Sequence, residues 1–213
     1  MPKRARVLSR RIVFRGPVFS VTSERVREPN GITARRDVIH HPGSVVILAV
    51  AKGRNVKDKN DADHRVLLER QYRYAAGQYL WELPAGRIDR GERPLTAAKR
   101  ELLEETGYTA RRWRRLLFYY ASPGFLDETM LVYLAQDLTR GRARPEADES
   151  IHTRFFSLAG LVKAAAVGRL RDGKTISAVL AYAAQKNEGR SSLTMLTIRS
   201  HGSLSQRRSP AKV

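Results

Sequence analysis

The stretch GRIDRGERPLTAAKRELLEETGY, residues 86–108, decides the fold class because it joins a glycine loop to a helix rich in acids. Pro94 suits the first turn of a helix, and Gly107 suits the position just after its end. Between them, apolar side chains recur at helical spacing: Ala97, Ala98, Leu102 and Leu103. The stretch therefore predicts a loop followed by a helix from Pro94 to Thr106.

Three acids of this helix indicate its chemistry. Glu101, Glu104 and Glu105 stand at i, i+3 and i+4, which places their carboxylates on one helix face. Taken alone, such a cluster is more often a solvated acidic face. The preceding glycine loop and the neighbouring Arg100 favour a metal site, because Mg²⁺ or Mn²⁺ prefers hard oxygen ligands and would offset the repulsion. The cluster therefore indicates metal-assisted chemistry on phosphate groups.

Strand patterns lie on both sides of this helix. The apolar run Val45–Ala51 is typical of a strand buried on both faces. Residues 1–44 predict short strands, with the dipeptide Asn30-Gly31 forming a hairpin turn. A polar loop is expected at residues 52–64. Further strands are predicted at residues 65–70, 79–83, 116–120 and 130–135, and further helices at residues 158–167 and 175–186.

Charge and composition divide the chain into three expected parts. These are an N-terminal β lobe at residues 1–44, a main domain at residues 45–188 and a disordered basic tail at residues 189–213. The formal net charge is +19, of which residues 1–27 carry +7 and the tail carries +5. This basicity fits attraction to nucleic acid or phosphate-bearing ligands, and it equally fits a solvated, Arg-rich surface.

Composition excludes several classes of protein. The chain has no cysteine, which rules out disulfide scaffolds, thiol enzymes and zinc–thiolate sites. Its longest apolar run is far shorter than the roughly 20 residues that span a bilayer. We therefore expect a soluble, cytoplasmic protein with no membrane partner. An N-terminal transit peptide is the less favoured alternative, because residues 1–23 are rich in Arg and contain no acid.

Residues 86–108 resemble, position for position, the 23-residue box of the Nudix hydrolases. The matching positions are Gly86, Glu92, Arg100, Glu101, Leu102, Glu104, Glu105, Gly107 and Tyr108. Aromatic Tyr108 is a mild departure at a bulky apolar position. The resemblance implies an α/β (α+β) Nudix fold, with a mixed β-sheet sandwiched between helices and a small N-terminal β lobe. It also implies hydrolysis of a nucleoside diphosphate linked to another group.

Three further stretches are similar to the ADP-ribose and ADP-sugar pyrophosphatase branch of that family. They are HPGSVVIL (residues 41–48), RQYRYAAGQYLWELPAG (residues 70–86) and ASPGFLDE (residues 121–128). The proline 16 residues after Gly107, Pro123, looks like the marker of the branch. The resemblance thus extends over roughly residues 12–187.

The resemblance implies a role for each matching residue. Metal ligands would be Glu101 and Glu105, with support from Glu104, the Ala85 carbonyl and Glu149. The residues that hold the box in shape would be Gly86, Glu92, Arg100 and Gly107. Substrate contacts would come from Arg73, Glu82, Pro123 and Gly124. The candidates for catalysis are Glu149, Glu104 and Glu146, with Glu149 favoured over Glu146 as the group that activates water.

Together these features predict a Mg²⁺-dependent enzyme, with Mn²⁺ as the alternative ion, that cleaves ADP-ribose or a related ADP-sugar into AMP and a sugar phosphate. The resemblance further implies a homodimer in which the β lobe of one subunit reaches the other. One alternative is a Nudix hydrolase for another nucleotide sugar, a dinucleotide cofactor or capped RNA. A second is a Nudix module without turnover that binds nucleic acid through its basic ends.

Overall fold

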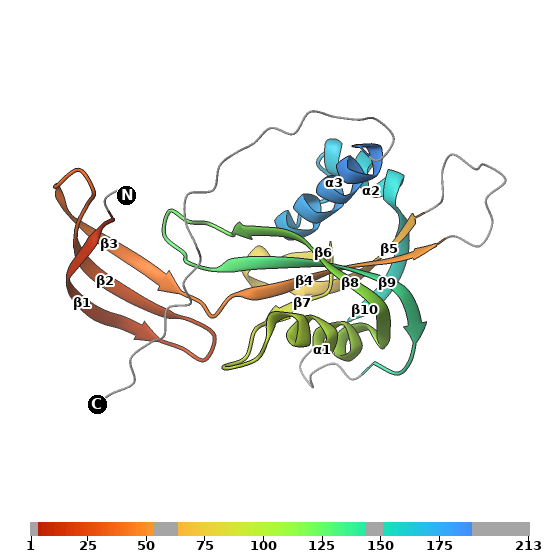
Figure 1. The fold of residues 1–213 in the computed structure, drawn as a ribbon, viewed down its shortest axis with the longest axis horizontal. Helices are drawn as coiled ribbons and strands as arrows, with labels where there is room; N and C mark the ends of the chain where they lie inside the picture. Colours follow the sequence, from red (N-terminus) through yellow and green to blue (C-terminus); the bar gives the residue numbers. More distant parts are fainter. Residues whose placement is uncertain (1–3, 53–63, 144–150, 189–213) are drawn as a thin grey trace.

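Two β-sheets, three α-helices and a short 3₁₀ helix (Tyr74–Ala76) make up the computed structural model, which describes residues 4–52, 64–143 and 151–188 (Figure 1). The smaller sheet has the order β1-β2-β3 and consists of β1 (Arg6–Arg15), β2 (Ser20–Arg27) and β3 (Thr33–His40). The larger sheet has the order β10-β5-β4-β9-β8, with β6 against β5 and β7 against β4. Its strands are β4 (Ser44–Lys52), β5 (His64–Arg73), β6 (Gln78–Glu82), β7 (Ala85–Arg87), β8 (Tyr108–Tyr120), β9 (Thr129–Arg140) and β10 (His152–Ser157).

The larger sheet is mixed and lies between helices. Strands β4 and β9 run parallel, whereas the other paired strands of this sheet are antiparallel. Helix α1 (Pro94–Thr106) covers one face, and α2 (Leu158–Ala166) and α3 (Gly173–Glu188) cover the other (Figure 1). This arrangement confirms the predicted fold class, a mixed sheet between helices. Helices cover both faces of β4, which explains its continuous apolar run.

Alternation along β4 divides its side chains between two cores. Val46, Leu48 and Val50 pack with α2 and α3. Val45, Ile47 and Ala49 pack with Ala97, Ala98 and Leu102 of α1. Burial of α1 against this sheet fixes where its acids lie.

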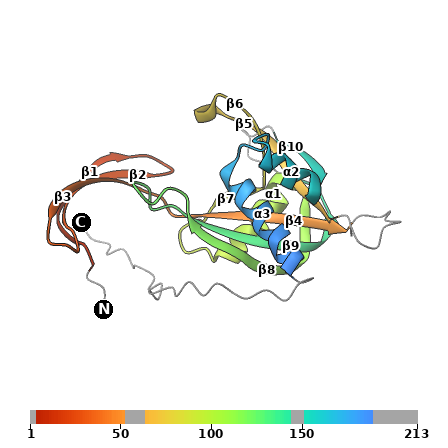
Figure 2. The same cartoon turned by 90° about the horizontal axis from the view of Figure 1, so that it is seen from above.

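The β1–β3 sheet projects from the rest of the molecule (Figure 2). All ten residues of β1 are exposed, including the apolar side chains Val7, Leu8, Ile12, Val13 and Phe14. The lobe is joined to the larger sheet through the loop between β8 and β9. There the Ile39 amide donates to the Phe125 carbonyl over 2.8 Å, and the Asp127 amide donates to the Ile39 carbonyl over 3.1 Å.

The structure also corrects several sequence-based boundaries. Strand β8 begins at Tyr108, well before the predicted start at residue 116, and β10 was not predicted. Helix α3 begins at Gly173, two residues earlier than expected. In the described part of the chain, no helix combines the length and apolar character needed to cross a bilayer. The predicted polar loop falls mainly on residues 53–63, and the tail on residues 189–213, both outside the described residues.

Candidate active site

Helix α1 and the short strand β7 bring two carboxylates together. Glu101 and Glu105 lie one turn apart on α1 and are only 9% and 5% exposed. The Ala85 amide of β7 donates a hydrogen bond to Glu105 Oε2 over 3.1 Å. Gly107 ends the helix in a left-handed conformation (φ 71°), and its amide donates to the Leu103 carbonyl. The C-terminal turn of α1 is therefore held against β7.

Gly86 allows the second carboxylate to approach the same segment. A Cβ at position 86 would lie 2.0 Å from Glu101 Cδ, which is far inside contact distance. The absence of a side chain at residue 86 thus lets the Glu101 carboxylate pack directly on the β7 backbone. Both carboxylates reach the Ala85–Gly86 segment.

Arg100 connects the remaining acids of the box. One of its terminal nitrogens, Nη1, lies 2.8 Å from Glu101 Oε1 and 3.0 Å from Glu104 Oε2. The other, Nη2, lies 3.1 Å from Glu92 Oε2 and donates to the Arg87 carbonyl over 3.2 Å. The hydrogen bonds that Arg100 donates to Glu92, and then to Glu104 and Glu101, raise the pKa of Arg100 despite its partial burial. Arg100 therefore offsets the repulsion among the acids. Glu104 pairs with Arg100 and is the most exposed of the three α1 acids, with its side chain 43% exposed.

The Glu92–Arg100 pair should make stability depend on pH. The hydrogen bond from Arg100 lowers the pKa of Glu92 below its ordinary value of 4.5. A carboxylate with a lowered folded-state pKa stabilises the fold above about pH 4.5 and loses that contribution as pH falls through the folded-state pKa. We expect Arg100→Gln to cost about 2 kcal/mol of unfolding free energy at neutral pH and clearly less near pH 3.

Urea unfolding of the wild type and the variant at both pH values measures this difference. Lys99→Gln is the control. Lys99 is exposed, and its replacement removes one positive charge from the position next to Arg100 on α1. An equal loss for the two variants, or a loss for Arg100→Gln that does not change with pH, would contradict the role of the ion pair.

A second polar cluster lies beside the box on β5, β6 and α3. Glu82 is 1% exposed and accepts two hydrogen bonds from Arg73, from Nε over 2.8 Å and from Nη2 over 3.0 Å. Lys174 Nζ also pairs with Glu82. Burial alone would lower the pKa of Arg73, but the hydrogen bonds with Glu82 and the charges of Glu69 and Glu105 raise it. The structure therefore uses Glu82 to fix two cations, and it brings Arg73 into the field of the box residue Glu105.

Thr175 ties this cluster to the segment before β7. Its hydroxyl accepts a hydrogen bond from the Leu83 amide over 2.8 Å and donates to Asp172. Asp172 in turn accepts from the Thr175 amide over 3.0 Å and pairs with Lys174 over 3.0 Å. The first turn of α3 thereby holds the chain two residues before Ala85.

Removing the Thr175 hydroxyl should destabilise the fold. Thr175 is fully buried, so Thr175→Val would leave the Leu83 amide without its acceptor at a cost of about 2 kcal/mol. Thr175→Ser retains the hydroxyl, and we expect it to cost under about 1 kcal/mol. Chemical denaturation of both variants measures the difference. Equal losses would show that the hydroxyl contributes no more to stability than the methyl group does, which would contradict this role of the hydroxyl.

Sequence reasoning missed Glu69, Asp172, Lys174 and Thr175. Asp172 carries a usable signal, since Asp is favoured immediately before a helix. Glu69 is fully buried and lies opposite Glu82 in the β5–β6 ladder. The only sequence signal for Glu69 is a single acid within an apolar strand. That signal does not indicate which strand pairs with it.

The other predicted residues lie elsewhere. Pro123 and Gly124 are exposed in the loop between β8 and β9, which meets the end of β3. The same loop accepts hydrogen bonds through Asp127 from the His41 amide over 2.8 Å and pairs with His40 over 2.7 Å. The structure thus places this loop at the junction of the two sheets. Glu146 and Glu149 lie outside the described residues.

The donor set at β7 suits a divalent cation. Glu101 and Glu105 supply carboxylate oxygens that meet at Ala85–Gly86, where the missing Cβ leaves room for Glu101. Such hard oxygen donors match Mg²⁺ or Mn²⁺. Within residues 4–52, 64–143 and 151–188, no three acidic or imidazole side chains form a complete metal-binding group. A third side-chain ligand would come from outside these ranges, from rearrangement of a described residue or from a second subunit.

Comparison with known proteins identifies the family. The model of the NUDIX domain matches residues 53–178, more than half of the chain. The chain belongs to the Nudix family. This Nudix chain is 32% identical over 176 residues to the ADP-ribose pyrophosphatase of Bacillus subtilis (strain 168), covering 82% of this chain and 90% of that relative.

A second relative agrees with this assignment, and a solved structure shares the fold. The Nudix chain is 34% identical over 178 residues to the ADP-ribose pyrophosphatase of Mycobacterium tuberculosis (strain ATCC 25618 / H37Rv), covering 82% of this chain and 81% of that one. The crystal structure of an ADP compounds hydrolase superposes with a TM-score of 0.71 at 23% identity, covering 89% of this chain and 98% of that one. The structural match supports the fold.

Proposed function

We propose that this Nudix protein hydrolyses the diphosphate bond of ADP-ribose or a related ADP-sugar, giving AMP and a sugar phosphate. The observation that carries the proposal is the meeting of Glu101 and Glu105 at Ala85–Gly86, inside the family's sequence box. Two relatives at 32% and 34% identity are ADP-ribose pyrophosphatases, which points to ADP-ribose among the substrates of Nudix enzymes.

Different residues would bind the metal ion, bind the phosphate and activate water in this reaction. Glu101, Glu105 and the Ala85 carbonyl would hold Mg²⁺, or Mn²⁺ in its place. When bound, such an ion polarises the phosphoryl group and stabilises the charge that develops during displacement. Arg73, whose Nε and Nη2 donate to Glu82, carries a guanidinium that would attract a phosphate through its charge and its remaining N–H groups. Water adds to one phosphorus as the bridging P–O bond breaks, and we assign removal of the water proton to Glu149, with Glu146 and Glu104 as alternatives.

Product analysis tests the substrate. The protein is incubated with ADP-ribose, other nucleotide sugars and capped RNA, with Mg²⁺ or with EDTA, and the products are separated by chromatography. We expect AMP and ribose 5-phosphate from ADP-ribose only when Mg²⁺ is present. Faster cleavage of a different substrate would reassign the specificity, and the absence of cleavage for the whole panel would contradict enzymatic function.

We further propose that the protein is a homodimer joined through the β1–β3 lobe. Strand β1 is an edge strand whose apolar side chains are exposed, and such an edge favours contact with a second chain. We expect the wild type to sediment as a dimer and Val13→Asp to sediment as a monomer. Val167→Asp is the matched control, since Val13 and Val167 are 53% and 59% exposed. A monomeric wild type, or an equal effect of both variants, would contradict this interface.

A further inference from the structure

Strands β4 and β9 separate at one end of the larger sheet. They pair in parallel from Ser44 and Met130 to Val50 and Gln136, and β9 then continues against β8 as far as Arg140. Asp137, the first residue after this pairing, has a φ of 58°, a left-handed conformation that is uncommon for a residue other than glycine. This conformation of Asp137 coincides with the point where β9 stops pairing with β4, toward the carboxyl ends of both strands.

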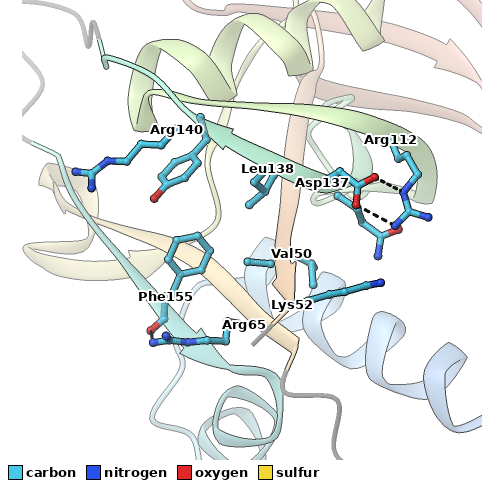
Figure 3. A pocket seen from close by; sticks show the side chains of 11 residues that line it. Val50, Lys52, Arg65, Arg112, Asp137, Leu138, Arg140 and Phe155 are labelled. Carbon is cyan, nitrogen blue, oxygen red and sulfur yellow. Dashed lines mark hydrogen bonds and ion pairs between the residues drawn. The ribbon is translucent and has the colours of Figure 1, made fainter. Parts of the chain in front are cut away.

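A cavity of about 660 Å³ lies at this separation (Figure 3). Its volume falls within the range of roughly 300–1,000 Å³ that is typical of small-molecule sites. Val50 and Leu138 contribute apolar side chains to its wall, together with the aromatic rings of Tyr108 and Phe155. The cavity therefore has both the size and the partly apolar lining to hold a planar ring.

Cations from four different strands surround the cavity. They are Lys52 of β4, Arg65 of β5, Arg112 of β8 and Arg140 of β9 (Figure 3). Among the described residues that line it, Asp137 is the single acid, and it pairs with Arg111 over 3.0 Å and with Arg112 over 2.9 Å. The hydrogen bond that Arg111 donates is the main cause that lowers the pKa of Asp137. This carboxylate therefore keeps its negative charge, which the two paired arginines offset. The excess of positive charge favours an anionic ligand.

The aromatic wall adds a second type of recognition. The rings of Tyr108 and Phe155 meet edge to face, with centroids 5.7 Å apart. The Arg65 guanidinium lies 6.0 Å from the centre of the Phe155 ring, and its Nη2 donates to the Phe155 carbonyl over 3.3 Å. Aromatic rings and guanidinium planes stack on nucleobases, whereas the guanidinium edges pair with phosphates. A ligand with both a base and a phosphate uses both features.

We propose that this cavity is a second nucleotide site, which binds a free nucleoside monophosphate. Tyr108, the last residue of the box, belongs to its wall, but the cavity lies further along the sheet than the Ala85–Gly86 segment that the box carboxylates reach. Ala85 pairs with Val46, and Val50 of the cavity wall lies four residues, or about 13 Å, further along β4. The proposal does not depend on the identity of the substrate hydrolysed at the box.

Titration calorimetry with AMP on the full chain, in EDTA, tests the second site. The test variant is Lys52→Gln combined with Arg140→Gln. The control is Lys163→Gln combined with Arg169→Gln, which removes the same charge from exposed positions outside the cavity. We expect the test variant to lose one AMP site, or to bind there at least tenfold more weakly, while the control variant retains it. Hydrolysis of ADP-ribose with Mg²⁺ should be unchanged in both variants.

Other outcomes would overturn the proposal. Identical AMP binding by the wild type and the test variant would remove the site. Equal losses in the test and control variants would show general electrostatic attraction. Inorganic phosphate binding as tightly as AMP would reduce the cavity to a simple anion site, and tighter binding of a 5′-phosphorylated RNA oligomer would make it part of a nucleic-acid surface. If kcat/KM for ADP-ribose fell in the test variant by the same factor as its AMP affinity, the cavity would be part of the active site.

Discussion

Replacing Glu105 by Gln should lower kcat by roughly 10³-fold, equivalent to about 4 kcal/mol of transition-state stabilisation. Gln has the same size and keeps an oxygen that can accept the hydrogen bond from the Ala85 amide, which Glu105 accepts over 3.1 Å. The variant therefore retains the local fold and loses one negative charge from the donor set. Steady-state kinetics over a range of Mg²⁺ concentrations measure the change, and circular dichroism confirms folding.

Glu104→Gln provides the comparison within the same helix. Glu104 pairs with Arg100 and has a side chain that is 43% exposed, whereas Glu105 is buried and accepts a hydrogen bond from the β7 backbone. We expect its loss of kcat to be at least tenfold smaller than that of Glu105→Gln. Near-full activity of Glu105→Gln at saturating Mg²⁺ would contradict the assignment of Glu105 as a metal ligand.

Gly86→Ala should lower kcat by roughly 10²-fold, with a change in unfolding free energy of under about 1 kcal/mol. The new methyl group would meet the Glu101 carboxylate at 2.0 Å. Because a carboxylate is the mobile end of its side chain, the fold can accommodate the methyl group by moving Glu101 out of position. Gly173→Ala is the control, since a Cβ at position 173 meets no heavy atom within 4 Å.

A double-mutant cycle shows whether Gly86 acts through Glu101. We expect Gly86→Ala to have little further effect on kcat once Glu101 has been replaced by Gln. The carboxylate that the new methyl group would displace is already absent from that variant. Kinetics of the two single variants and the double variant give the coupling. Fully additive losses would show that residue 86 affects the reaction by another route.

The box helix could be predicted because its determinants are local. Pro94 and Gly107 mark its ends, and the observed helix runs over the predicted residues. The apolar run of β4 and the hairpin turn at Asn30-Gly31 were likewise visible in short windows. By contrast, the first half of β8 is rich in Arg and lacks the apolar pattern of a strand. It is a strand because it pairs with β9 at the edge of the sheet, and this pairing is not visible in a local window.

The site was only partly predictable, because its key contacts join distant residues. Helical spacing placed the three acids of α1 on one side. It could not show that Glu101 and Glu105 reach the Ala85–Gly86 backbone, whereas Glu104 pairs with Arg100 and stays partly exposed. The pairing of Glu82 with Lys174 spans 92 residues. It depends on the packing of α3 against the sheet, which no local pattern encodes.

Cation binding at Ala85–Gly86 tests the central claim most directly. Electron paramagnetic resonance of added Mn²⁺, with AMP present, counts the ions bound by the wild type and by the variant that combines Glu101→Gln with Glu105→Gln. If these two carboxylates hold the ion, the wild type binds Mn²⁺ and the folded double variant loses at least one bound ion per chain. Equal Mn²⁺ binding by the two proteins, or no binding by the wild type, would contradict a metal site built on α1.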